Sequence, residues 1–272
     1  MIDEQVVAEW IERLRAQIPG VVAIVLKGSH ARGNPGPWSD VDFDVLTFNE
    51  DVEHEYLSWI ADDGSGRLVH VSVAVERLDD WVRGFREVAS WSFGLPSREI
   101  TKLVWLGRPS LRAELDRPFR DHPGGEPELE DFCEELGKAR NARARGDEVA
   151  LRLDVQEIAR LCPTLLAPLN EPVCPGTRPE ALQAALDFVV APDGYREDML
   201  FCLGLSGRPS TADEILAAGE RLAFGTLTLL EANADTVSPL LAPHLPELLV
   251  SGMLRRYLEQ GEAVSPTEGR GS

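Results

Sequence analysis

The chain has 272 residues, of which 43% are hydrophobic and 27% charged, and its formal net charge is −19. These proportions are typical of a folded globular protein and exclude a fibrous or disordered chain. No apolar run approaches the ~18 residues of a membrane span and the first residues are acidic, so a cytoplasmic location is expected. The negative charge disfavours nucleic acid as a partner and favours cations, although acidity can also serve solubility alone.

Helices and strands alternate in the first half of the chain. Apolar residues at helical spacing predict a helix over about 4–18, and a continuous apolar run predicts a buried strand over 21–26. Alternating polar and apolar residues predict further strands over 40–46 and 67–76, and a fourth over 101–106. We therefore expect a small mixed-sheet α/β domain over residues 1–116.

The second half has the periodicity of helices alone. Prolines and glycines mark residues 117–127 as a linker, and residues 128–260 are expected to form an all-helical bundle, followed by a mobile tail over 261–272. A break is expected near Gly146, and Ser210 with Asp213 resembles a capping box. The other expected helices cover 179–190, 196–205, 211–234 and 245–260. The four cysteines and five histidines show no metal-ligand spacing, so buried free thiols are expected.

A turn with the chemistry of a phosphate site follows the first strand. Gly28 lets the backbone approach a ligand closely, and Ser29 can add a hydroxyl. A glycine and serine in such a turn are also common where no ligand binds, so the pair is informative only in context. Arg32, at the end of the turn, is expected to be structural.

Two aspartates begin the second strand. Asp40 and Asp42 are two residues apart, so their carboxylates project from one face and suit Mg²⁺, which prefers oxygen ligands. Asp44 continues this row, but it would lie far from Asp40, and we expect it to pair with Lys27 or a helix end. The aspartate pair is therefore the predicted metal site.

The combined pattern of apolar strand, Gly28-Ser29, a gap and Ser39-Asp40-Val41-Asp42 resembles the nucleotidyltransferase superfamily related to DNA polymerase beta. The resemblance implies that Gly28 and Ser29, with Ser39 beside them, hold a nucleoside triphosphate. It implies that Asp40 and Asp42 hold the catalytic Mg²⁺ ions. The resemblance covers residues 20–47 closely and the rest of the first half by the order of its elements.

The helical half is similar to that of the aminoglycoside and lincosamide nucleotidyltransferases. The similarity rests on Glu134-Glu135-Leu136-Gly137-Lys138, on residues 143–147 and on residues 165–170. In that family a lysine of the helical domain reaches the nucleotide phosphates, which implies this role for Lys138. An equally good interpretation places Lys138 on a solvated helix face.

One feature of the family pattern is missing. Many members carry a third acidic residue on the next strand, where this chain has His70 and Ser72. His70 can be the base that accepts the acceptor proton, or a half-buried structural histidine. Glu76, Glu134 or Glu135 can take that role instead, or the protein binds nucleotide without turnover.

The resemblance implies a Mg²⁺-dependent transfer of a nucleoside monophosphate, with ATP the expected donor, to a hydroxyl of a small cationic molecule, as in antibiotic resistance. The acidic block from Glu114 to Glu135 is either a solvated linker or one wall of a cleft that attracts a polyamine. Trp38, in the loop before Asp40, can flank the nucleotide or the acceptor. The alternatives are a toxin-like enzyme acting on tRNA or protein, and a degenerate nucleotide-binding protein.

Overall fold

The computed structural model describes residues 4–52, 54–62, 66–84, 93–116 and 119–260. The chain forms two compact units, the first from residues 1–87 and 98–123 and the second from residues 88–97 and 124–272. The expected tail over 261–272 lies outside the described residues. Each unit has a hydrophobic core of its own.

A five-stranded sheet forms the first unit, with the order β3-β4-β2-β1-β6. Strand β2 runs parallel to β4, while β1 pairs antiparallel with both β2 and β6, so the sheet is mixed as predicted. A second, two-stranded sheet joins β5 to β7. The strands are β1 (Val21–Leu26), β2 (Val41–Thr47), β3 (Glu55–Asp62), β4 (Leu68–Arg77), β5 (Ser97–Ile100), β6 (Lys102–Leu106) and β7 (Phe119–His122).

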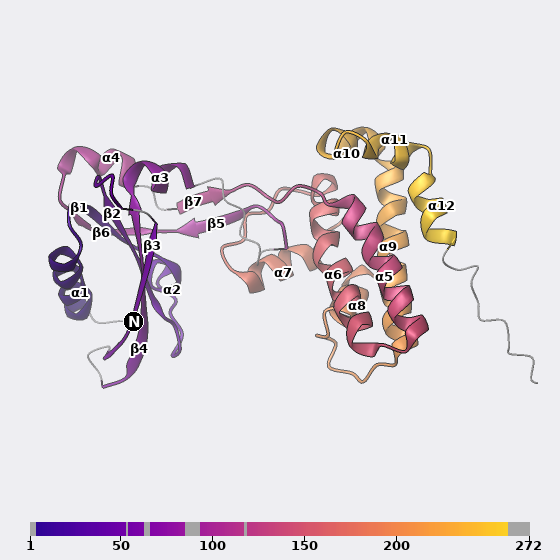
Figure 1. Ribbon diagram of the computed structural model, residues 1–272, viewed down its shortest axis with the longest axis horizontal. Helices are drawn as coiled ribbons and strands as arrows, with labels where there is room; N and C mark the ends of the chain where they lie inside the picture. The colour runs from indigo at the N-terminus through magenta and orange to yellow at the C-terminus, as the bar shows by residue number, and fades with distance from the viewer. Residues whose placement is uncertain (1–3, 53, 63–65, 85–92, 117–118, 261–272) are drawn as a thin grey trace, which may run out of the picture. The chain divides into compact units, whose positions relative to one another are not determined.

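Helices cover the two faces of this sheet (Figure 1). Helix α1 (Glu4–Gln17) buries Trp10 and Leu14 against alternate residues of β2 and β4, among them Phe43. Trp81 of α3 (Leu78–Arg83) packs on the opposite face, beside Leu115 of α4 (Arg112–Leu115). The alternation of β2 thus directs Asp42 and Asp44 away from α1, toward the face that carries Trp81.

The second unit is helical, and α5, α6 and α9 form its centre. Gly146 ends α5 in the left-handed conformation, with φ of 72°, which confirms the predicted break. The elements are α5 (Leu129–Arg145), α6 (Glu148–Leu166), η4 (Ala167–Leu169), α7 (Arg178–Leu186), α8 (Tyr195–Cys202), α9 (Ala212–Ala232), α10 (Ala234–Val237), η5 (Ser238–Leu240), α11 (Leu245–Val250) and α12 (Met253–Gln260). None of the described helices is long and apolar enough to cross a membrane.

Several local predictions were wrong. Strand β3 was not predicted, and the single helix expected over 245–260 is broken at Gly252, whose φ is 67°. The capping box at the start of α9 consists of Thr211 and Glu214, not of Ser210 and Asp213. Cys174 is exposed, whereas the other three cysteines are buried as expected.

The segment between the units is also more structured than expected. Residues 117–127 were predicted to be a linker, but β7 lies within this range. Residues 93–97, assigned to the first domain by sequence, belong mainly to the second unit, where the hydroxyl of Thr164 donates to the carbonyl of Phe93 at 3.0 Å. The chain therefore passes from one unit to the other more than once.

Candidate active site

The turn after β1 is held against β2. The Lys27 N–H donates to the Asp42 carbonyl at 2.9 Å, and Gly28 then begins the short helix α2 (Gly28–Arg32) with φ of 63°. A Cβ atom at Gly28 would lie 2.8 Å from Oδ2 of Asp42. Only glycine therefore satisfies both the positive φ and the close approach of the Asp42 carboxylate.

The two predicted metal ligands influence each other. Asp42 is half-buried on β2, and Asp40 is exposed in the loop immediately before it. Burial first, and then the charge of Asp40, raises the pKa of Asp42 to about 6. Burial and the second carboxylate thus outweigh the favourable charge of Lys27, and a bound cation would relieve this arrangement.

A small cavity of about 160 Å³ lies beside Asp42 in the first unit. Lys27, Gly28 and Asp42 line it together with Phe43, Tyr56, Ser72, Ala74 and Glu99. The parallel register places Ser72 of β4 opposite Asp42, and the antiparallel register places Ser58 of β3 opposite Ser72. The site therefore opens on the sheet face that does not contact α1.

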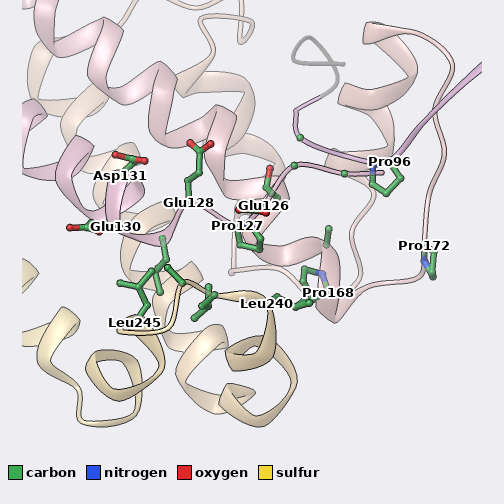
Figure 2. Close-up of a pocket in the computed structure, with 18 of the residues that line it drawn as sticks. Pro96, Glu126, Pro127, Glu128, Glu130, Asp131, Pro168, Pro172, Leu240 and Leu245 are labelled. Carbon is green, nitrogen blue, oxygen red and sulfur yellow. The ribbon is translucent and has the colours of Figure 1, made fainter. Parts of the chain in front are cut away.

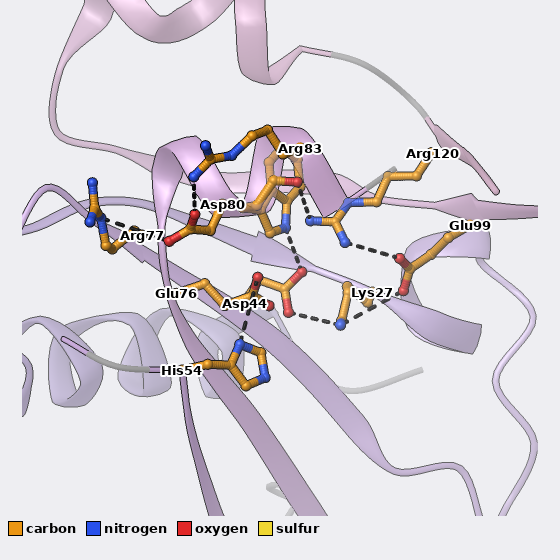
Figure 3. A network of polar contacts seen from close by, with 10 residues as sticks. Lys27, Asp44, His54, Glu76, Arg77, Asp80, Arg83, Glu99 and Arg120 are labelled. Carbon is orange, nitrogen blue, oxygen red and sulfur yellow. Dashed lines mark hydrogen bonds and ion pairs between the residues drawn. The ribbon is translucent and has the colours of Figure 1, made fainter. Parts of the chain in front are cut away.

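Asp44 is a structural carboxylate, as predicted. It is fully buried, its carboxylate lies 2.8 Å from the Lys27 ammonium, and it accepts a hydrogen bond of 2.7 Å from the Trp81 indole N–H (Figure 3). Burial on its own would lower the pKa of Lys27, but Asp44 and Glu99 outweigh it, so the pKa of Lys27 is raised. Lys27 is therefore a permanent cation beneath the site.

The structure brings Glu99 to the site, and sequence analysis missed it. Glu99 on β5 lies 3.8 Å from the Lys27 ammonium and 3.7 Å from the Arg120 guanidinium, as Figure 3 shows. Arg120 in turn donates to the Trp81 carbonyl at 3.1 Å and stacks on the Trp81 ring. Because Glu99 also lines the cavity with Asp42, it supplies a third carboxylate where the pattern on β4 lacks one.

The other candidate bases have different surroundings. His70 is exposed on β4, on the same sheet face as Ser72, and its strand partner is Ile60. Glu76 lies 3.8 Å from His54, and burial together with Asp44 raises the pKa of Glu76. Neither residue lines the cavity beside Asp42.

Two of the three remaining predicted nucleotide ligands, Ser39 and Lys138, have local partners. The Ser39 hydroxyl accepts a hydrogen bond of 2.8 Å from the Gly36 N–H, and Ser29 is half-buried in α2. Lys138 lies on α5 of the second unit, where its ammonium is 2.5 Å from Glu135 and 3.7 Å from Glu134. The hydrogen bond to Glu135 and the negative charges of both glutamates raise the pKa of Lys138.

The residues at the site fit a divalent cation that shares its coordination with substrate. No group of three or more His, Cys, Asp or Glu able to hold a metal occurs among the described residues. Asp40 and Asp42 supply two oxygen-donor side chains, and Mg²⁺ completes such a set with water and phosphate oxygens. The raised pKa of Asp42 and the space left by Gly28 both agree with this use.

The mixed sheet, with its Gly-Ser turn and aspartate pair, agrees with the nucleotidyltransferase resemblance of the sequence. The family described as nucleotidyltransferase domain matches residues 7–89, and the family described as nucleotidyltransferase, substrate binding domain, matches residues 128–232. The chain therefore belongs to the nucleotidyltransferases, and it is a transferase enzyme with a domain of each kind.

Individual proteins resemble the chain only distantly. A solved structure of a nucleotidyltransferase-like protein from Exiguobacterium sibiricum 255-15 is 14% identical, with a TM-score of 0.40, and the match covers 99% of this chain and 97% of that one. No curated protein matches the chain in sequence.

Proposed function

We propose that the protein transfers a nucleoside monophosphate from a nucleoside triphosphate, with ATP the expected donor, to a hydroxyl of a small cationic, aminoglycoside-like molecule. The observation that carries the proposal is the contact between the Gly28 turn and the Asp42 carboxylate, in a family whose activity is nucleotidyl transfer. The net charge of −19 disfavours tRNA as the acceptor.

Each residue of the proposed site has a part in binding. Gly28 and Ser29 of the turn hold the triphosphate, with Ser39 and Lys138 as further nucleotide ligands. Asp40 and Asp42 hold Mg²⁺, which when bound neutralises charge on the phosphates and lowers the pKa of the attacking hydroxyl. Lys27 holds Asp44 and Glu99 in place and keeps positive charge beneath the turn.

The reaction forms one bond and breaks another. The acceptor oxygen bonds to the α-phosphorus, the bond from this phosphorus to the bridging oxygen breaks, and pyrophosphate leaves with that oxygen. The acceptor proton passes to a base of the protein. Glu99 is our first candidate because it lines the cavity beside Asp42, and His70 is the second because it lies on the same sheet face.

Pyrophosphate release with Mg²⁺ and each nucleoside triphosphate, over a panel of hydroxylated amines, tests the activity. Asp42→Asn should abolish turnover, and Asp51→Asn, at an exposed loop position of the same unit, should not. Turnover retained by Asp42→Asn would remove the metal assignment.

The same assay separates the two bases. Removal of a general base lowers kcat by about a hundredfold or more. We expect this loss for Glu99→Gln and a smaller effect for His70→Ala. The reverse order would assign the proton transfer to His70, as the sequence suggested.

A further inference from the structure

The sheet face that carries Asp42 is covered at one end and exposed at the other. Trp81 of α3 packs on the covered end, where its indole N–H donates to Asp44. Along β4 the exposed fraction of the residues on this face rises from 5% at Ala74 to 69% at Leu68. The end of the face at the start of β4 is therefore exposed.

Large apolar side chains gather at this exposed end. The exposed fractions are 95% for Trp38, 67% for Ile60 and 69% for Leu68. In the antiparallel register Ile60 of β3 and Leu68 of β4 are diagonal neighbours on the same face. The Arg67 guanidinium donates to the Pro37 carbonyl, which ties the loop that carries Trp38 to the start of β4. We call Trp38, Ile60 and Leu68 the apolar patch.

The apolar patch is continuous with the residues at the proposed metal site. Ser72 of β4 lies opposite Asp42, and Ser58 of β3 lies opposite Ser72. Ile60 is the next residue after Ser58 that projects from this face of β3. Two hydroxyl groups thus lie between the Asp42 carboxylate and the apolar patch.

The direction of the proposed reaction places the acceptor on this side of Asp42. The turn that holds the leaving pyrophosphate follows β1, and α2, which begins there at Gly28, contacts β2. In an in-line displacement the acceptor oxygen approaches from the side opposite the leaving group. In the sheet β2 lies between β1 and β4, and β3 lies beyond β4. The acceptor should therefore lie over β4 and β3.

We infer that the apolar patch binds an apolar group of the acceptor, whose reacting hydroxyl lies near Ser72 and Ser58 beside Asp42. The inference rests on the proposed function and specifies an amphiphilic acceptor, with an alkyl or aryl substituent on a hydroxylated head. Single exposed apolar residues are common on protein surfaces, but adjacent ones mark interaction sites. A wholly hydrophilic acceptor would leave the patch in water.

The second unit offers a different place for an apolar group. It contains a cavity of about 820 Å³, and Figure 2 shows carboxylates from the start of α5 in the upper part of the view, with Leu240 and Leu245 below them. None of the described residues that line this cavity belongs to the row of Asp42, Ser72 and Ser58. Variants in the patch and in the cavity therefore distinguish the two places.

Octyl glucoside and methyl glucoside test the inference, because they share a neutral hydroxylated ring and differ in the length of the apolar chain. Isothermal titration calorimetry on the full chain compares them without nucleotide, below the concentration at which octyl glucoside forms micelles. We expect octyl glucoside to bind at least about tenfold more tightly, since its additional methylenes leave water on binding. Equal affinity for the two glucosides would overturn the inference.

Variants then locate the apolar chain. The double variant Ile60→Ser/Leu68→Ser should weaken octyl glucoside about tenfold, and Tm should change little because both positions are exposed. Leu240→Ser, at a half-exposed position of the cavity, and Val149→Ser, at an exposed position of α6, are the matched controls and should bind as the wild type does. Binding that is lost in Leu240→Ser and kept in the double variant would overturn the inference.

Kinetics connects the apolar patch to the reaction. For an acceptor that supports pyrophosphate release and carries an apolar substituent, the double variant should raise the acceptor KM about tenfold and leave the KM for the triphosphate unchanged. An unchanged acceptor KM would overturn the inference even though the proposed function holds. If no acceptor supports pyrophosphate release, the proposed function fails, and the calorimetric comparison still decides whether the patch binds an apolar group.

Discussion

Neutralising Asp42 should stabilise the protein while removing its activity. Asp42 has an ordinary pKa of 3.8 and a pKa of about 6 in the folded protein, because burial and Asp40 disfavour its charged form. Between these two values the folded protein binds more protons than the unfolded chain, so stability falls as pH rises. Above pH 6 the full penalty of the charged Asp42 is present, and below about pH 4 it has disappeared.

The size of this gain in stability follows from the pKa shift of Asp42. About two pKa units correspond to about 3 kcal/mol, at about 1.4 kcal/mol per unit. Asp42 is partly exposed and water screens its charge, so we expect Asp42→Asn to raise the free energy of unfolding by about 1–2 kcal/mol at pH 8.

Urea denaturation of the wild type and Asp42→Asn at pH 8 and pH 4 measures this difference. The gain at pH 8 should vanish at pH 4, and Asp51→Asn should show neither effect. Adding MgCl₂ at pH 8 should stabilise the wild type by mass action and leave Asp42→Asn nearly unchanged. A variant that is less stable at pH 8, or a gain that does not depend on pH, would refute the reasoning.

Gly28→Ala and Gly33→Ala both place alanine at a positive φ, which costs about 1–2 kcal/mol. At Gly28 the new Cβ atom would also lie 2.8 Å from Oδ2 of Asp42, whereas at Gly33 it would meet nothing within 4 Å. Pyrophosphate release should therefore be lost in the first variant and kept in the second. Lys27→Met leaves the buried Asp44 unpaired and should lower the free energy of unfolding by about 3 kcal/mol in urea, with a smaller loss in Lys27→Met/Asp44→Asn. Lys138→Ala should raise the KM for the triphosphate and leave Tm unchanged; an unaltered KM would make Lys138 a surface residue.

The sequence predicted the parts of the fold whose burial has a regular period. The valines at alternate positions of β4 are buried, and the continuous apolar run of β1 lies inside the sheet. The edge strand β3 was missed because its outward face mixes Tyr56 and Ile60 with polar residues, which weakens the alternation. The break before α12 was marked by Gly252, a signal that the apolar periodicity on either side concealed.

Part of the candidate site could likewise be predicted from the sequence, and part could not. The turn and the aspartate pair are close in sequence, so the family resemblance identified them together. Asp44 was expected to pair with Lys27 or a helix end, and the structure shows the pair with Lys27. Glu99 comes to the site through Lys27 and Arg120, contacts that only the folded chain creates. Its four-residue strand is too short to show a period, so no local pattern could have identified it.

The path of the chain limits how the protein can be divided. Residues 93–96 belong to the second unit but precede β5, β6 and β7, which lie mainly in the first unit, along the chain. Here the Gly125 N–H donates to the Gly94 carbonyl at 2.6 Å, and Leu95 is fully buried. A fragment that begins at residue 124 would lack residues 93–97 and would expose the surface of the second unit that they cover. We therefore expect the fragments 1–123 and 124–272 to be insoluble when each is expressed alone. Function should return only when both are expressed together, because the first fragment then supplies residues 93–97 to the second.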